Sequence, residues 1–460
     1  MIDSDGNGGK IASVTPEIAS QKKIFDFLMG SQFWSAERLI TYQRSQLGQL
    51  LRFAHAHIPF YRERLKPVMR GDGNIDWERW QDVPILKRQD LLDHREAMQA
   101  TALPPGHGAV VEHAGSGTTG TPVVTRHNRL TSIASHAAMY RAFYWHGEDF
   151  SKTMCFPFGH KPDIAAWPDG SNRGLWGPPW EAKSAQGKLL VINRFASGEQ
   201  IVEFMVRNNA RYLNGWAERM QALALTAEAM GVSHRLERIF TTGSTISDAA
   251  REDCKRVFGA QFHALYSSKE VYNIAHQCPS GQHYHINSEL VQAEVLDQND
   301  QPCPPGVAGR AVVTQFFNTA QPFIRYEIGD QIVMGGACNC GRHLPVIERI
   351  EGRIVHLFRF PGRQPTALSV NPKHLRLIGA RSWQFAQVSP LGLEVRYVSD
   401  ESHRTPDFAG MTQVLRDLGD PRLEVTYRQC ESLPLAPSGK FIEYVCELPA
   451  SAIKIDSSAI

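Results

Sequence analysis

Short runs of β-branched residues alternate with helical stretches between about residue 109 and residue 260, and this alternation constrains the fold more than any other feature. The runs read AVVEHA, PVVTRH, KLLVIN and RIFTTG, and helical patterns at 197–208 and 217–230 lie among them. Strands that alternate with helices form mostly parallel sheets covered on both faces. The sequence therefore predicts an α/β fold.

The segments before and after this region have different hydrophobic patterns. Residues 20–70 have leucines at helical spacing, interrupted at Pro59, which predicts helices. Residues 290–335 indicate strands joined by a turn at QNDQPCPPG, and a smaller mixed region with a last strand, FIEYVCEL, follows residue 355. We expect a large N-terminal domain over residues 1–352 and a small α+β C-terminal domain over residues 353–460.

The charge balance excludes several classes of partner. Lys plus Arg number 49 and Asp plus Glu 47, a net charge of +2, so no basic field favours nucleic acid or an anionic membrane. The start, MIDSDGNGGK, is unlike a secretory leader, and no apolar run has membrane-spanning length. Eight cysteines in 460 residues are sparse for a disulfide scaffold. We expect a soluble cytoplasmic protein with reduced cysteines.

A glycine-rich stretch, AGSGTTGTP at residues 114–122, matches two phosphate-binding motifs in part. Gly115, Gly117 and Gly120 satisfy G-x-G-x-x-G, but that fingerprint must open a helix, and Pro122 followed by β-branched residues favours a strand. A Walker A loop needs Lys after Gly120, where this chain has Thr121. What remains is a hydroxyl-rich turn between two strands, which is either an anion-binding loop or an ordinary hairpin.

Several motifs, in their order along the chain, resemble the adenylate-forming superfamily of acyl-CoA synthetases, adenylation domains and luciferases. They are SGTTGTP, FTTGSTIS (240–247), YSSKE (266–270), QPFIRYEIGD (321–330), CNCGRHLPVIERIEGR (338–353) and PSGKFIEYV (437–445). The resemblance is closest to the phenylacetate–CoA ligase branch and its capsule-biosynthesis relatives. It implies a large multi-sheet N-terminal domain and a small C-terminal lid domain.

The resemblance implies that a carboxylate attacks the α-phosphate of ATP and releases pyrophosphate. The loop residues Ser116, Gly117, Thr118, Thr119, Gly120 and Thr121 would hold the β- and γ-phosphates. Glu270 matches the glutamate associated with Mg²⁺, a hard ion that prefers oxygen ligands. Lys440 matches the lysine that bridges the acyl carboxylate and the phosphate, where a compact cation stabilises the transition state.

The same resemblance assigns the nucleoside. Tyr266 would lie beside the adenine, and Asp330 would accept hydrogen bonds from the ribose hydroxyls. Arg353 would lie near the nucleotide and the hinge. Gly243, Ser244 and Ser267 complete the predicted nucleotide-binding residues.

The residues considered singly leave other interpretations open. A carboxylate such as Glu270 is commonly a solvated surface group, Asp330 after a glycine is commonly a turn residue, and Lys440 beside Gly439 is commonly a loop lysine. The chain also departs from the family pattern at three places: Thr121 replaces a common lysine, Ser244-Thr245 replaces an acidic segment, and no acid follows Arg353 at the hinge. The missing hinge acid puts the second half-reaction in doubt.

Cysteines and histidines suggest a zinc site. Cys338 and Cys340 are one residue apart, and Cys278 precedes His285 by seven residues, which suits a closed tetrahedral site but is equally compatible with reduced, partly buried cysteines. The phenylacetate–CoA ligase branch carries a similar zinc-binding set, which implies Cys278, His285, Cys338 and Cys340. His283 is the reserve ligand, because strand alternation places it on the face of His285.

The acid and its acceptor are less defined. The stretch 154–182 is rich in aromatic residues, which either line a pocket for a small, aromatic carboxylic acid or anchor loops. The acceptor of the acyl group is CoA, giving a thioester, or an amine, giving an amide as in indoleacetate–lysine ligase. A nucleotide-binding protein without catalysis is the third alternative, and a homodimer is left open.

Overall fold

The computed structural model describes residues 15–114, 123–158, 163–182, 186–353, 358–362, 368, 370, 374, 376–399, 405–433 and 444–448. The N-terminal helices are α1 (Pro16–Ser31), α2 (Ala36–His57), α3 (Pro59–Arg64) and α4 (Arg88–Asp93), with a 3₁₀ turn, η1, at Trp77–Asp82. The predicted helical segment is confirmed. Pro59 is the first residue of α3, where a backbone N–H would have no partner within the helix, so a proline there costs no helical hydrogen bond. Leu47, Leu50 and Leu51 of α2 are buried.

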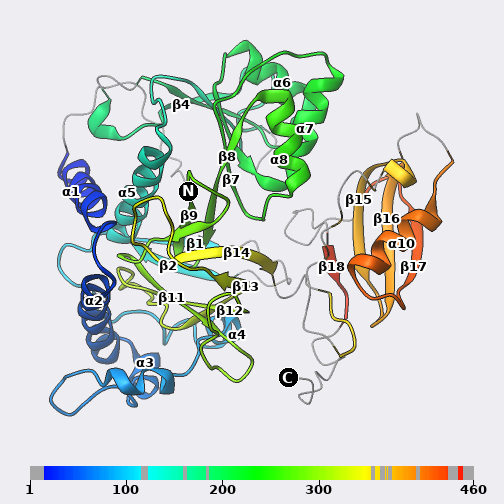
Figure 1. The fold of residues 1–460 in the computed structure, drawn as a ribbon. Helices are drawn as coiled ribbons and strands as arrows, with labels where there is room; N and C mark the ends of the chain where they lie inside the picture. Colours follow the sequence, from blue (N-terminus) through cyan, green and yellow to red (C-terminus); the bar gives the residue numbers. More distant parts are fainter. Residues whose placement is uncertain are drawn as a thin grey trace.

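A 12-stranded sheet forms the centre of the large domain (Figure 1). Its strand order is β11-β12-β13-β14-β10-β9-β8-β7-β6-β3-β5-β4. The strands are β3 (Met154–Pro157), β4 (Ser171–Leu175), β5 (Lys188–Ile192), β6 (Tyr212–Trp216), β7 (Arg238–Thr242), β8 (Gln261–Ser268), β9 (Tyr272–Gln277), β10 (Tyr284–Ile286), β11 (Val291–Leu296), β12 (Ala308–Gln315), β13 (Tyr326–Met334) and β14 (Val346–Arg353).

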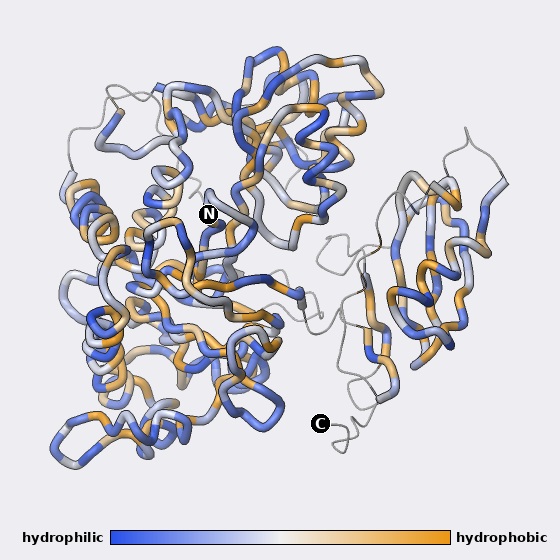
Figure 2. Tube along the Cα trace, viewed as in Figure 1, coloured by the Kyte–Doolittle hydropathy of each residue, from blue (hydrophilic) through white to orange (hydrophobic). Residues whose placement is uncertain are grey.

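Pairing divides this sheet into two halves that meet at β8. Strands β5, β3, β6, β7 and β8 run parallel, whereas β8 to β14 pair antiparallel with their neighbours. The parallel strands alternate with α6 (Gly198–Arg207), α7 (Ala217–Ala229) and α8 (Asp248–Phe258), as predicted. Hydrophobic and hydrophilic residues alternate along these helices (Figure 2), and the buried ones include Ile201, Phe204, Leu223 and Phe258.

A separate hairpin brackets the glycine-rich stretch. Strands β1 (Val110–Ala114) and β2 (Val124–Asn128) pair antiparallel, with Ala114 opposite Val124. The two predicted strands are confirmed, and residues 115–122 between them lie outside the described residues. A strand, and not the helix that a dinucleotide fingerprint requires, begins at Val124. Helix α5 (Arg129–His146) starts only after β2.

The C-terminal region has its own sheet and core. Strands β15 (Ala380–Gln387), β16 (Gly392–Ser399), β17 (Glu424–Gln429) and β18 (Tyr444–Cys446) form a four-stranded sheet, with α10 (Phe408–Leu418) on one face (Figure 1). Phe358, Phe385, Met411 and Leu415 are among its buried residues. The predicted fold class is confirmed, while the boundary at residue 352/353 stays a prediction. None of the described helices combines the length and the apolar character needed to cross a bilayer.

A buried ion pair ties three elements of the large domain together. Arg141 of α5 and Glu289, which precedes β11, have side chains with 0% exposure, and Nη1 of Arg141 lies 2.6 Å from Oε1 of Glu289. Arg141 also donates to the carbonyl of Leu28 in α1, and the hydroxyl of Ser31 donates to Glu289. Because each charge depends on the other and on these hydrogen bonds, removal of one partner leaves an uncompensated buried charge.

We expect Glu289→Gln to lower the free energy of unfolding by about 3–5 kcal/mol, because it strands the Arg141 guanidinium in the core. Denaturant titration followed by circular dichroism measures this change. Asp26→Asn is the control, since Asp26 pairs with Lys22 at the surface, where the side chains are 55% and 48% exposed, and we expect a change below about 1 kcal/mol. Equal effects of the two substitutions would contradict the structural role of the buried pair.

Candidate functional site

The carboxyl ends of the parallel strands meet at one edge of the large sheet, where open α/β sheets bind their ligands. Thr242 ends β7, and its hydroxyl lies 3.2 Å from the hydroxyl of Ser267 near the end of β8. Gly243 follows with φ of +95°, and a Cβ there would lie 3.1 Å from the Trp216 ring at the end of β6. Glycine therefore permits the close approach of the 243–244 segment to Trp216. Gly243 and Ser244 are exposed at this edge.

Two predicted nucleotide-binding residues are in direct contact. The hydroxyl of Tyr266 in β8 donates a hydrogen bond of 3.0 Å to Oδ2 of Asp330 in β13, and both residues are buried. Asp330 lies in a strand, so its interpretation as a turn residue is wrong. A carboxylate has about four acceptor sites, which leaves capacity for further donors such as ribose hydroxyls. Tyr266 thus orients a carboxylate that the sequence associates with the same ligand.

Glu270 lies in the turn between β8 and β9, half-buried rather than fully solvated. The preceding carbonyl, that of Lys269, accepts a hydrogen bond of 3.1 Å from Nε2 of His127 in β2. Burial, followed by the neighbouring His113, lowers the pKa of His127 to about 3, so this imidazole is neutral at physiological pH. His127 therefore links the hairpin strand β2 to the turn that carries Glu270.

Several predicted residues lie outside the described part of the chain. They are Ser116, Gly117, Thr118, Thr119, Gly120, Thr121 and Lys440, together with the side chain of Arg353. The backbone of Arg353 is described at the end of β14, where it pairs with Asp330. The roles of all these residues stay predictions.

The aromatic residues of the 154–182 stretch separate into two groups. Trp176 is buried against Phe150 and Tyr212, and Trp180 packs on Phe25, so both act as core anchors. Phe158 instead stacks on Trp216, with ring centroids 6.1 Å apart, at the carboxyl edge of the sheet beside Gly243. Only this second group lies where an acyl group could meet the nucleotide-binding residues.

Cysteine and histidine side chains converge between β9–β10 and the 338–340 turn. Ligand atoms of Cys278, His283, His285 and Cys338 all lie within 4.8 Å of one another. Sγ of Cys278 is 3.8 Å from Sγ of Cys338, which matches the edge of a tetrahedron with zinc–sulfur bonds of about 2.3 Å. Cys340 is nearby, because its Sγ lies 3.2 Å from Nε2 of His285.

The donor chemistry of this cluster fits a metal ion. Nδ1 of His285 lies 3.3 Å from the Leu344 carbonyl and donates to it, which leaves Nε2 as the lone-pair donor that a metal requires. Burial raises the pKa of Cys278 to about 11, so its proton must leave when an ion binds. The geometry brings together all five predicted ligands and includes His283 in the closest group of four, so the choice between His283 and Cys340 is open.

A second group, His146, Glu148 and His263, does not fit a metal ion. The imidazole rings of His146 and His263 stack with centroids 4.1 Å apart and an interplanar angle of 25°, so one ion cannot lie in both ring planes. Glu148 already pairs with Arg238 at 2.9 Å. Burial nevertheless raises the pKa of Glu148 to about 7.

Comparisons with known proteins identify the fold. No protein-family model matches the chain, and no curated protein matches its sequence. The solved structure of 2-hydroxyisobutyryl-CoA ligase in the postadenylation state, in complex with 2-HIB-AMP, has a TM-score of 0.67 at 19% identity, over 92% of this chain and 90% of the ligase. Anthranilate CoA ligase AuaEII in complex with anthranoyl-AMP has a TM-score of 0.54 at 13% identity, over 74% of this chain and 67% of that ligase.

The amide bond synthetase McbA from Marinactinospora thermotolerans also shares this fold. Its TM-score is 0.50 at 14% identity, over 92% of this chain and 98% of the synthetase. At such identities the likeness shows a fold shared with these CoA ligases and this amide bond synthetase. The predicted fold is confirmed, whereas the phenylacetate–CoA ligase branch is not confirmed.

Proposed function

We propose that this chain is an ATP-dependent carboxylate ligase that joins a carboxylic acid to AMP and releases pyrophosphate. The single observation that carries the proposal is the hydrogen bond between Tyr266 and Asp330, because it joins two motifs 64 residues apart into one polar site. The site lies at the carboxyl edge of the parallel strands, in a fold shared with solved acyl-adenylate complexes. We infer a soluble, cytoplasmic enzyme.

The proposed mechanism assigns each group a physical task. Asp330 accepts the ribose hydroxyls while Tyr266 holds the carboxylate in orientation. Residues 116–121 donate backbone N–H groups and hydroxyls to the β- and γ-phosphates. Glu270 would hold Mg²⁺, which when bound neutralises charge on the phosphate oxygens. The Lys440 ammonium stabilises the negative charge that develops between the acyl carboxylate and the α-phosphate.

We expect Lys440→Ala to lower acid-dependent ATP–pyrophosphate exchange by at least about 100-fold, because a preorganised positive charge at the reaction centre is lost. ATP binding, measured by calorimetry, should persist, since Lys440 acts in the chemical step. Mass spectrometry of reactions with a panel of carboxylic acids should detect an acyl-AMP in the wild type alone. A wild-type protein that binds ATP but exchanges pyrophosphate with no acid would favour the nucleotide-binding protein without catalysis.

CoA is the proposed acyl acceptor, and an amine is the alternative. The absence of an acid after Arg353 keeps the amide alternative open, because the residue expected at the hinge for the second half-reaction is missing. The shared fold does not discriminate, since it includes both CoA ligases and an amide bond synthetase.

Titration of free thiol separates the two acceptors. With the acid that supports exchange, we expect CoA thiol to disappear in proportion to the AMP formed. A chain that forms acyl-AMP, leaves the CoA thiol intact and acylates an added amine would contradict the thioester and establish the amide.

We further propose that Cys278, His285 and Cys338, with Cys340 or His283 as the fourth ligand, hold a structural zinc ion. Four protein ligands leave no open coordination position, so the ion would join the 278–285 segment to the 338–340 turn without entering the reaction.

Elemental analysis tests this site. We expect about one zinc per purified chain, with loss of the ion and a lower unfolding temperature in Cys278→Ser and Cys338→Ser. Comparison of His283→Ala with Cys340→Ser identifies the fourth ligand as the one whose loss removes zinc. Cys430→Ser is the control, because this cysteine lies in the C-terminal domain, and an equal zinc content in all variants would contradict the site.

A further inference from the structure

Tyr272, the first residue of β9, has an unusual backbone conformation. Its φ is +55°, in the left-handed region, which bulky aromatic residues rarely adopt. Such a conformation costs on the order of 1–3 kcal/mol and persists only where surrounding contacts enforce it. Tyr272 lies two residues after Glu270, so the contacts that enforce its conformation also restrict the turn that carries this glutamate.

The enforcing contacts come from the hairpin that brackets residues 115–122. The hydroxyl of Tyr272 lies 2.9 Å from Nε2 of His113 in β1. The ring of Tyr272 stacks on that of His127 in β2, with centroids 4.3 Å apart and an interplanar angle of 20°. Phe323 stacks beside His127 at 6.2 Å, so the imidazole is held from more than one side.

His113 and His127 reach Tyr272 together because of the hairpin register. His113 is opposite Thr125 and Val111 is opposite His127, so both histidines lie on one face of the two-stranded sheet. One ring therefore contacts both strands, and each strand leads directly to one end of residues 115–122.

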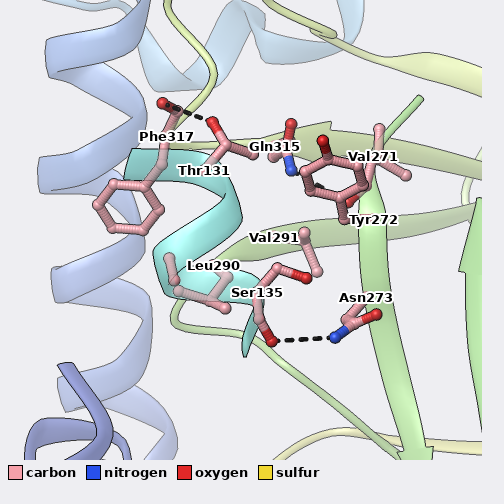
Figure 3. A pocket seen from close by; sticks show the side chains of 10 residues that line it. Thr131, Ser135, Val271, Tyr272, Asn273, Leu290, Val291, Gln315 and Phe317 are labelled. Atoms are coloured by element: carbon pink, nitrogen blue, oxygen red, sulfur yellow. Dashed lines mark hydrogen bonds between the residues drawn. The ribbon is translucent and has the colours of Figure 1, made fainter. Parts of the chain in front are cut away.

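The backbone carbonyls of Lys269 and Val271, the residues on either side of Glu270, also accept hydrogen bonds from side chains. Nε2–H of His127 donates to the Lys269 carbonyl at 3.1 Å, and Nδ1 of His127 accepts from the Asn318 amide at 3.2 Å. The side-chain amide of Gln315 in β12 donates to the Val271 carbonyl at 3.1 Å. Figure 3 shows Gln315 beside Tyr272 and Val271 at a small cavity whose rim includes Thr131. The backbone around Glu270 is thus held by side chains from two strands, β2 and β12.

We propose that Tyr272, His113 and His127 form a clamp that fixes the Glu270 turn to both strands of the β1–β2 hairpin. The clamp is a set of positioning residues: it sets the position of the Glu270 turn relative to β1 and β2, the two strands that flank residues 115–122 in the chain. This proposal rests on the proposed function, in which Glu270 holds Mg²⁺ and the loop holds the phosphates. An ion that must contact a protein carboxylate and phosphate oxygens at once is sensitive to the position of that carboxylate, because its bonds tolerate little variation in length.

Tyr272→Phe tests the clamp with little change in packing, since the ring and its stacking remain while the hydrogen bond to His113 is lost. We measure ATP affinity by calorimetry in excess Mg²⁺ and again in chelator, and take the ratio as the magnesium-dependent gain. We expect this gain to fall about tenfold in Tyr272→Phe, while affinity in chelator is unchanged. Loss of one partly buried hydrogen bond is of this size. His113→Leu should behave alike, and His113→Gln, which keeps an acceptor, should restore most of the gain.

Tyr61→Phe is the matched control. Tyr61 has 1% exposure, and its hydroxyl donates to the Pro322 carbonyl at 2.7 Å and accepts from the Ile324 N–H at 3.4 Å. This variant loses two buried hydrogen bonds, neither of them to the Glu270 turn or to the hairpin, and should keep the full magnesium-dependent gain. The double variant Tyr272→Phe with His113→Leu should be no worse than either single change, since both break one contact.

A readout without ligand separates the clamp from the proposed function. In the protein alone, Tyr272→Phe should accelerate amide hydrogen exchange at residues 268–272, and Tyr61→Phe should not. A wild type with a magnesium-dependent gain that Tyr272→Phe retains in full would overturn the clamp and leave the proposed function intact. A wild type that binds no ATP would contradict the proposed function and the magnesium role of the clamp. Faster amide hydrogen exchange in Tyr272→Phe would still show that the hydrogen bond between Tyr272 and His113 orders the turn.

Discussion

The pairing of β8 is the constraint on which the site depends. This strand is parallel to β7 on one side and antiparallel to β9 on the other, so it joins the two halves of the large sheet. The parallel pairing with β7 ends at Ala264, and the register with β9 shifts between Tyr266 and Ser267. Irregularities of this kind redirect side chains at the edges of sheets. The change of direction places Tyr266 against β13 and Ser267 against β7, so two distant motifs reach one position.

The turn after β8 extends the same arrangement to the hairpin. Glu270 follows β8 directly, and the chain then enters β9 through the left-handed residue Tyr272. The contacts of Tyr272 with His113 and His127 dock the hairpin at this point. A residue in a strained conformation that is held by the buried His127 and the partly buried His113 indicates a turn whose position is fixed by its neighbours.

Periodicity and motif order were sufficient for the architecture. The helical spacing around Leu47 and Leu51, the β-branched runs and the alternation of 188–258 predicted the elements, because these patterns reflect which face of each element is buried. The family resemblance assigned Tyr266 and Asp330 to the same nucleotide, but the hydrogen bond between them was not predicted. The clamp was missed, since His113 and His127 lie in the strand patterns AVVEHA and PVVTRH without an assigned role, and no quoted motif includes Tyr272. Knowledge of the hairpin register would have placed the two histidines on one face, but the positive φ of Tyr272 leaves no signature in the sequence.

The sequence by itself determined the α/β class, the strand–turn–strand setting of the glycine-rich stretch and the set of cysteines and histidines at 278–285 and 338–340. Each of these follows from local spacing and residue type. Only the tertiary structure decided which distant side chains come into contact. These contacts are the hydroxyl of Tyr266 with Asp330, His283 with Cys338, and Tyr272 with both strands of the hairpin. The reason is physical, because strand order and register bring together residues far apart in the chain, and neither is written in the spacing of any single segment.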